Sequence, residues 1–125
     1  GAHHSAGIQD GDRLLYGGEP AGLIFGFADG TRVYHAGDTN VFGDMRIIAE
    51  LYRPDVALLP IGDRYTMGPR EAALACELIG APTVIPMHYG TWPILTGTPD
   101  MLREQCVARG IEVDIVALRP GESWT

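Results

Sequence analysis

From residue 23 onward, the sequence alternates short apolar runs with segments long enough to form helices. The run from Val56 to Ile61 constrains the fold most, because it contains no charged or amide side chain and predicts a fully buried strand. Strands that alternate with helices in this way are typical of a layered α/β protein with a largely buried sheet. We therefore expect a single α/β domain.

Turn and capping residues set the expected boundaries of these elements. The Asp29-Gly30 pair lies between two β-type runs and predicts a hairpin, and Pro69 suits the first turn of a helix. Asp44 is expected to cap a helix, while the segment from Gln9 to Gly22 is expected to be the one long loop. The expected strands are 23–27, 31–35, 56–61, 83–87 and 113–116, and the expected helices are 45–52, 69–79 and 98–109.

The charge and composition of the chain exclude several classes of function. A formal net charge of −7, with only nine scattered Lys and Arg residues, disfavours binding to a nucleic-acid backbone. No apolar run approaches the roughly 20 residues that a membrane-spanning helix needs, so we expect a soluble, cytoplasmic protein. Cys76 and Cys106 fall inside expected helices without a CxxC spacing, and we interpret them as small core residues rather than as a disulfide or a zinc site.

Three groups of polar residues indicate a possible site: His3-His4-Ser5, the segment 35–39 and the segment 88–91. Each is expected at the carboxyl end of a strand, the edge of an α/β sheet where side chains from distant segments converge on a ligand. Imidazole and carboxylate groups together suit Zn²⁺, Mn²⁺ or Fe²⁺, and a carboxylate can bridge two cations. Taken singly, a histidine at a strand end is more often a hydrogen-bonded structural residue, and Asp38 also fits a plain turn.

Four segments, in this order, resemble the metal-dependent hydrolase branch of the metallo-β-lactamase superfamily. They are Ala2 to Gly7, Tyr34 to Met45, Leu59 to Ala72 and Pro86 to Pro93, so the resemblance covers nearly the whole chain. It implies half of a metallo-β-lactamase αβ/βα sandwich, with a mixed sheet and helices on its outer face. Residues 1–125 would be the C-terminal half of the hydrolase domain, with the N-terminal half missing.

The resemblance also implies a ligand set. His4 matches a ligand of the first metal, Asp38 matches the aspartate that bridges two metals, and His88 matches a ligand of the second metal. Asp38 and His88 are therefore the expected catalytic residues, and two Zn²⁺ ions are the expected cofactor, with Mn²⁺ or Fe²⁺ as alternatives. The family's His-x-His-x-Asp-His string, which supplies the remaining ligands, does not occur in this sequence.

Four more residues are candidates for substrate binding. Arg64 and Tyr65 belong to the loop after the 56–61 strand, and this loop is expected either to line a pocket or to be a plain connection. The family often carries His or Asn at position 64. Tyr89 and Thr91 lie close to the predicted ligand His88. They are expected either to donate hydrogen bonds to a substrate oxyanion or to pack in an ordinary turn.

Two neighbouring side chains are interpreted as structural. His35 is expected to be a buried strand residue satisfied by backbone, with orientation of the Asp38 loop as the alternative. Trp92 is expected to be a hydrophobic plug rather than a recognition element.

The function that the resemblance implies is hydrolysis by metal-activated water, with an ester, lactone, amide or phosphodiester as substrate. Three ligands divided between two metals cannot close either coordination shell, so the isolated chain is expected to be inactive. An apolar sheet face is expected to be exposed and to bind the missing N-terminal half or a second copy. The alternative is a non-catalytic α/β module that pairs with a partner chain.

Overall fold

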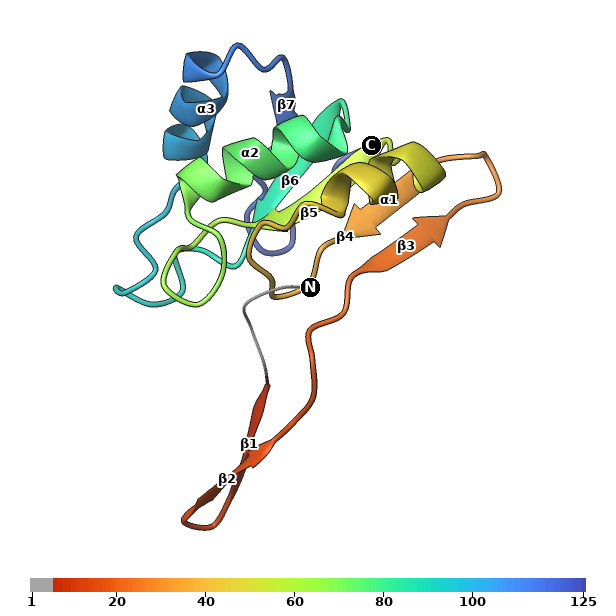
Figure 1. Cartoon of the computed structure of the whole chain (residues 1–125). Helices are drawn as coiled ribbons and strands as arrows, with labels where there is room; N and C mark the ends of the chain where they lie inside the picture. The colour runs from red at the N-terminus through yellow and green to blue at the C-terminus, as the bar shows by residue number, and fades with distance from the viewer. Residues whose placement is uncertain (1–5) are drawn as a thin grey trace.

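The computed structural model describes residues 6–125, which form a mixed five-stranded sheet with three helices on one face and a separate two-stranded arm (Figure 1). The sheet order is β3-β4-β5-β6-β7, with β3 antiparallel to β4 and the other neighbours parallel. The predicted α/β class is thereby confirmed. The elements are β1 (Gly7–Asp10), β2 (Arg13–Tyr16), β3 (Leu23–Gly26), β4 (Arg32–His35), α1 (Met45–Tyr52), β5 (Val56–Pro60), α2 (Pro69–Ile79), β6 (Thr83–Met87), α3 (Pro99–Ala108) and β7 (Asp114–Ile115).

The expectation of one long loop over residues 9–22 is wrong for residues 9–16, whereas residues 17–22 contain no helix or strand. Residues 7–16 form a hairpin in which Ile8 pairs with Leu15 and Asp10 with Arg13, and this arm extends away from the sheet (Figure 1). Gly11 supplies the positive φ of 58° that its tight turn requires. The Asp-Gly signal that correctly predicted the β3–β4 hairpin therefore also occurs here, at Asp10 and Gly11, where the surrounding glycines obscured it.

The helices begin and end as proline and glycine dictate. Pro69 occupies the first turn of α2, and Gly80 ends that helix in the left-handed conformation at a φ of 64°. Asp44 does precede α1, but its side chain makes no capping hydrogen bond to any described residue, because its own backbone is already helical. No helix among residues 6–125 is long and apolar enough to cross a membrane.

The core lies between the sheet and the helices. Register places Tyr34, Ala57 and Val84 side by side on one face of β4, β5 and β6, and all three are buried. Met45 of α1 and Leu102 of α3 are also buried in this core. The sheet thus uses one face to bind all three helices.

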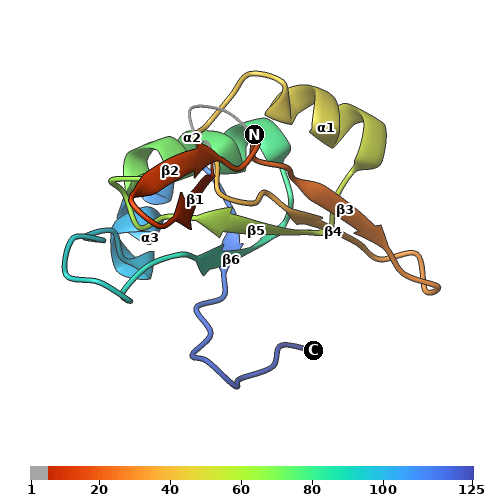
Figure 2. The ribbon, with the colours of Figure 1, turned by 90° about the horizontal axis from the view of Figure 1, so that it is seen from below.

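The opposite face of the sheet is not covered by helices. Side chains alternate between faces along a strand, so this face carries Leu23 and Phe25 of β3, which are 55% and 45% exposed, and the half-buried Val33, Leu58 and Ile85. Figure 2 shows the helices on one side of the sheet and the C-terminal residues on the other. The described residues therefore leave an apolar sheet face open to solvent.

Tyr34 gives the fold an expected sensitivity to high pH. Burial raises the pKa of its phenol above the ordinary value of 10.0, so the unfolded chain ionises before the folded one as pH rises. We expect the free energy of unfolding of the wild type to fall when the pH exceeds about 10, and to fall less in Tyr34→Phe. Urea unfolding of both proteins at neutral and high pH measures the difference. Equal pH slopes for the two proteins would show that this hydroxyl is not the group responsible.

Candidate metal centre

The loops that follow β4, β5 and β6 lie at one edge of the sheet, because these three strands are parallel. Asp38 comes from the loop after β4 and His88 from the loop after β6, although 50 positions separate them in the sequence. The structure brings them together, with Nε2 of His88 3.8 Å from Oδ2 of Asp38. The predicted convergence of these two side chains therefore occurs.

The separation of the two atoms fits a shared cation better than a direct bond. At 3.8 Å they exceed hydrogen-bonding distance. Zinc lies about 2.0–2.2 Å from imidazole nitrogen or carboxylate oxygen, so one ion can reach both atoms at this spacing. The side chains of His88 and Asp38 are 29% and 48% exposed, which leaves the pair open to solvent. The donor set and its spacing thus suit a divalent cation such as Zn²⁺.

The backbone around the two side chains adopts rare conformations that need close packing. His88 itself has a positive φ of 55°, which non-glycine residues seldom adopt. Gly37 has a φ of 70°, and a Cβ atom there would lie 2.4 Å from the carbonyl oxygen of Ala21. A Cβ atom at Gly62 would lie 2.1 Å from the carbonyl oxygen of His88. Glycines therefore let the loops approach closely enough to hold Asp38 and His88 near each other.

His35 connects strand β4 to the Asp38 loop. Its Nδ1 accepts a hydrogen bond from the backbone N–H of Gly37 at 3.1 Å, and the side chain is half-buried. The contact at Nδ1 agrees with the structural interpretation of His35, although the side chain is half-buried rather than buried. Because the bonded residue directly precedes Asp38, the same contact also fixes the path of the Asp38 loop.

Replacement of His35 tests this contact. We expect Gly37 N–H to exchange with solvent about 5-fold faster in His35→Phe, because a hydrogen bond of roughly 1 kcal/mol is lost. Asparagine places an acceptor close to the position of Nδ1, so His35→Asn should exchange nearly as slowly as the wild type. Amide exchange followed by NMR measures both rates, and equally fast exchange in the two variants would contradict the assignment.

One nitrogen of His88 has no partner within the described part of the chain. Nδ1 is buried and makes no hydrogen bond to residues 6–125, whereas Nε2 faces Asp38. An imidazole that binds a metal through one nitrogen ordinarily donates from the other nitrogen to a carboxylate or carbonyl group. The orientation of His88 therefore suits metal binding through Nε2. Its Nδ1 has no hydrogen-bond partner among residues 6–125.

The predicted ligand His4 lies outside the described residues. Within residues 6–125, no group of three or more His, Cys, Asp and Glu side chains is arranged to hold a metal ion. Asp38 and His88 thus form a pair of candidate ligands that requires further donors. The assignment of His4 as one of them stays a prediction.

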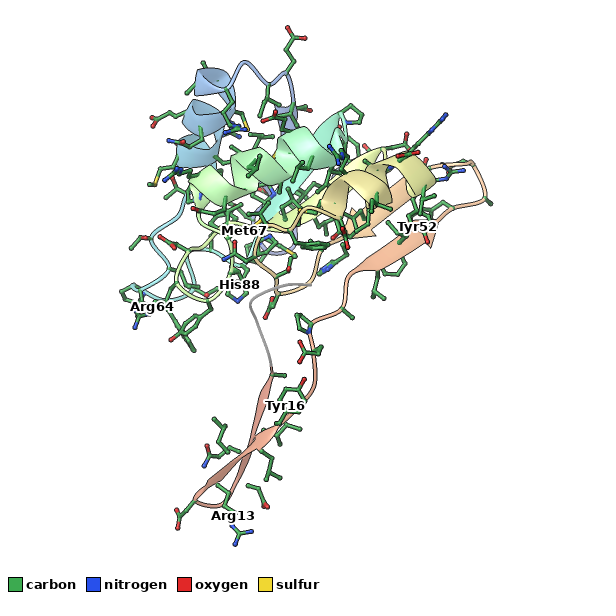
Figure 3. The ribbon with its side chains drawn as sticks, viewed as in Figure 1. Arg13, Tyr16, Tyr52, Arg64, Met67 and His88 are labelled. Atoms are coloured by element: carbon green, nitrogen blue, oxygen red, sulfur yellow. The ribbon has the colours of Figure 1, made fainter. Side chains whose placement is uncertain are left out.

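The candidate substrate residues divide between two places. Tyr89 and Thr91 line an open groove of about 610 Å³ together with His88 and the C-terminal segment 118–122. Tyr65 is exposed, and Arg64 lies in the outer part of the loop after β5 (Figure 3), so neither residue lines this groove. Tyr89 and Thr91 therefore share this groove with the candidate ligand His88.

The prediction of Trp92 as a hydrophobic plug is wrong, because this residue is 62% exposed.

Two further features of the site had no clear signal in the sequence. Thr39 is fully buried beside Asp38 and donates from Oγ1 to the carbonyl of Asn40 at 2.8 Å. The segment 118–122 reaches the His88 groove from the end of the chain, where neither periodicity nor a motif pointed to it.

Comparison with known proteins identifies relatives in sequence and in fold. A family model described as a β-lactamase superfamily domain matches residues 1–89. A UPF0173 metal-dependent hydrolase from Herpetosiphon aurantiacus is 53% identical over 99% of this chain and 52% of its own length. A protein of the same name from Solibacter usitatus is 55% identical over 97% of this chain and 52% of its own length. Igni18, a metallo hydrolase from the archaeon Ignicoccus hospitalis, shares 39% identity and a TM-score of 0.76 over 98% of this chain and 48% of that chain.

The fold and the site define an α/β protein that presents an imidazole and a carboxylate at the carboxyl edge of a mixed sheet. The chain belongs to the metallo-β-lactamase superfamily, because the family model matches residues 1–89 of its 125 residues. The resemblance inferred from its four sequence segments is therefore confirmed. The chain spans about half the length of the curated relatives it matches.

Proposed function

We propose that Asp38 and His88 hold a catalytic metal ion in a hydrolase, and that the 3.8 Å approach of the two side chains is the observation that carries this assignment. The relatives named metal-dependent hydrolases support it, since they are more than 50% identical to this chain. A divalent cation at this site would lower the pKa of water to about 7 and stabilise negative charge on a substrate. Zn²⁺ is our proposed metal, with two ions in the complete enzyme and Mn²⁺ or Fe²⁺ as alternatives.

The side chains around the pair have separate proposed roles. Asp38 would supply negative charge to the metal, and a carboxylate can bridge two ions. His88 would supply an imidazole nitrogen, and its loop holds Nε2 toward Asp38. Tyr89 and Thr91 line the adjoining groove, where their hydroxyl groups can donate to a substrate oxygen. These roles suit the hydrolysis of an ester, lactone, amide or phosphodiester.

The substrate roles of Arg64 and Tyr65 are a weaker part of the proposal, because both lie outside the His88 groove. Arg64 adopts a positive φ of 64°, and its N–H donates to Oδ1 of Asp63 at 2.8 Å. That bond involves the backbone N–H of Arg64 and not its guanidinium, which could reach a substrate that extends beyond the groove. We keep both residues as candidates for contacts with the distal part of a substrate.

We further propose that this chain acts as the C-terminal half of the hydrolase domain and needs an N-terminal half for activity. The chain spans 52% of its relatives, and the open sheet face exposes apolar side chains such as Leu23 and Phe25. His4 and groups from the N-terminal half would complete the coordination of two metals. Without that half, the open face would promote association between copies of the chain.

The metal affinity of the isolated chain tests this division of the site. We expect calorimetric titration of the 125 residues with Zn²⁺ to show weak binding, because the described residues provide only the pair Asp38 and His88. Addition of the N-terminal half is expected to raise the affinity. Tight binding of two ions per isolated chain would contradict the proposal.

A further inference from the structure

Two cysteines from different helices lie in the same buried core cluster, away from the residues assigned to the metal. Cys76 lies on α2 and Cys106 on α3, two helices that pack against each other on the same side of the sheet (Figure 1). Both side chains are 2% exposed, and both are free thiols. Both belong to the same buried core cluster, in which the two thiols lie close enough to interact.

The interaction of the two thiols shifts their pKa values in opposite directions. Hydrogen bonding to Cys106 raises the pKa of Cys76, and burial raises it further. The same bond lowers the pKa of Cys106, and the positive charge of Arg109 adds to this effect. A lowered thiol pKa favours the nucleophilic thiolate, so Cys106 is the more reactive of the two.

An ion pair bridges the same two helices beside the thiols. Nε of Arg109 donates to Oε2 of Glu77 at 3.0 Å, and Nη2 of Arg109 contacts the same oxygen. Glu77 follows Cys76 directly, and Arg109 lies three positions after Cys106. The ion pair therefore adjoins the thiols, where it would limit access to them from solvent.

We propose that Cys76 and Cys106 are a modification site at which a peroxide forms a reversible disulfide between α2 and α3. Cys106 thiolate attacks one peroxide oxygen, so an S–O bond forms, the O–O bond breaks and hydroxide leaves. The sulfur of Cys76 then displaces the oxygen from the sulfenic acid, so the S–S bond forms and water leaves with the Cys76 proton. Two thiols are oxidised and one peroxide is reduced.

The disulfide would affect the outer helical layer. Cys76 and Cys106 are 30 positions apart, so the bond would close a loop that contains β6 and the His88 loop. Closing a loop of this length in the unfolded chain is expected to raise Tm by an amount on the order of 10 °C.

Hydrogen peroxide treatment of the reduced chain tests the proposal. We expect both thiols to disappear together, the mass to fall by about two units, and dithiothreitol to restore the starting state. On a non-reducing gel the chain should remain a monomer. Met101, which is 43% exposed, reports whether the peroxide has acted. Oxidised Met101 with both thiols still free, a sulfinic acid on one cysteine, or a disulfide between chains would each overturn the proposal.

A second experiment tests whether the Glu77–Arg109 ion pair limits the access of peroxide to the thiols. Glu77→Gln removes the negative partner of Arg109 and is expected to speed disulfide formation several-fold. Glu104→Gln makes the same chemical change at an exposed position of α3 and should leave the rate unchanged. Equal rates in the two variants would overturn the role of the ion pair.

Discussion

Replacement of Asp38 by asparagine is expected to lower hydrolase activity by about 10³-fold, because the amide removes the negative charge that holds the metal. The test uses the protein that carries both halves of the domain. Its kcat/KM is measured on simple ester, lactone, amide and phosphodiester substrates, together with the metal content of the purified protein. We expect activity and metal content to fall together in Asp38→Asn.

Asp44 provides the matched control for Asp38→Asn. It lies six positions further along, is exposed, and makes no side-chain capping bond within the described chain. Asp44→Asn removes the same charge and should leave activity and metal content unchanged. Full activity in Asp38→Asn would support the alternative of a non-catalytic α/β module, whereas equal losses in both variants would indicate a general effect of charge.

Replacement of Gly62 by alanine is expected to destabilise the protein by about 3 kcal/mol and to displace the His88 loop. The added Cβ would lie 2.1 Å from the carbonyl oxygen of His88, so backbone must move to accommodate it. Because His88 already has an unusual positive φ, that movement would also carry Nε2 away from Asp38. Urea unfolding measures the stability, and metal affinity measures the effect on the site.

Gly43 is the control for Gly62→Ala. A Cβ at Gly43 would meet no atom within 4 Å, so Gly43→Ala should leave the free energy of unfolding within about 0.5 kcal/mol of the wild type. Wild-type stability and metal affinity in Gly62→Ala would show that the two loops are less closely packed than the structure indicates.

The sequence predicted an element correctly where its local turn or burial signal agreed with the alternation of strands and helices along the chain. The apolar run at 56–61 and the Asp29-Gly30 turn predicted β5 and the β3–β4 hairpin, because burial and turn geometry depend on nearby residues. Asp38 and His88 were placed at the same sheet edge because parallel strands end there together. The fold class and the pairing of these two residues therefore followed from the sequence.

Other features depend on contacts that no local pattern encodes. The β1–β2 arm has ordinary strand residues, but its high glycine content is equally typical of a loop. His88 has a positive φ, and its carbonyl group lies against Gly62, which is distant in sequence. The groove formed with segment 118–122 likewise depends on where the end of the chain lies in space. Such features need tertiary structure.

The position of the metal tests the central assignment most directly. Crystals of the protein with both halves of the domain, grown with Zn²⁺, should give an anomalous diffraction peak at the zinc absorption edge. We predict a peak about 2 Å from both Oδ2 of Asp38 and Nε2 of His88. Zinc bound only at other residues, beyond the reach of these two atoms, would contradict the assignment.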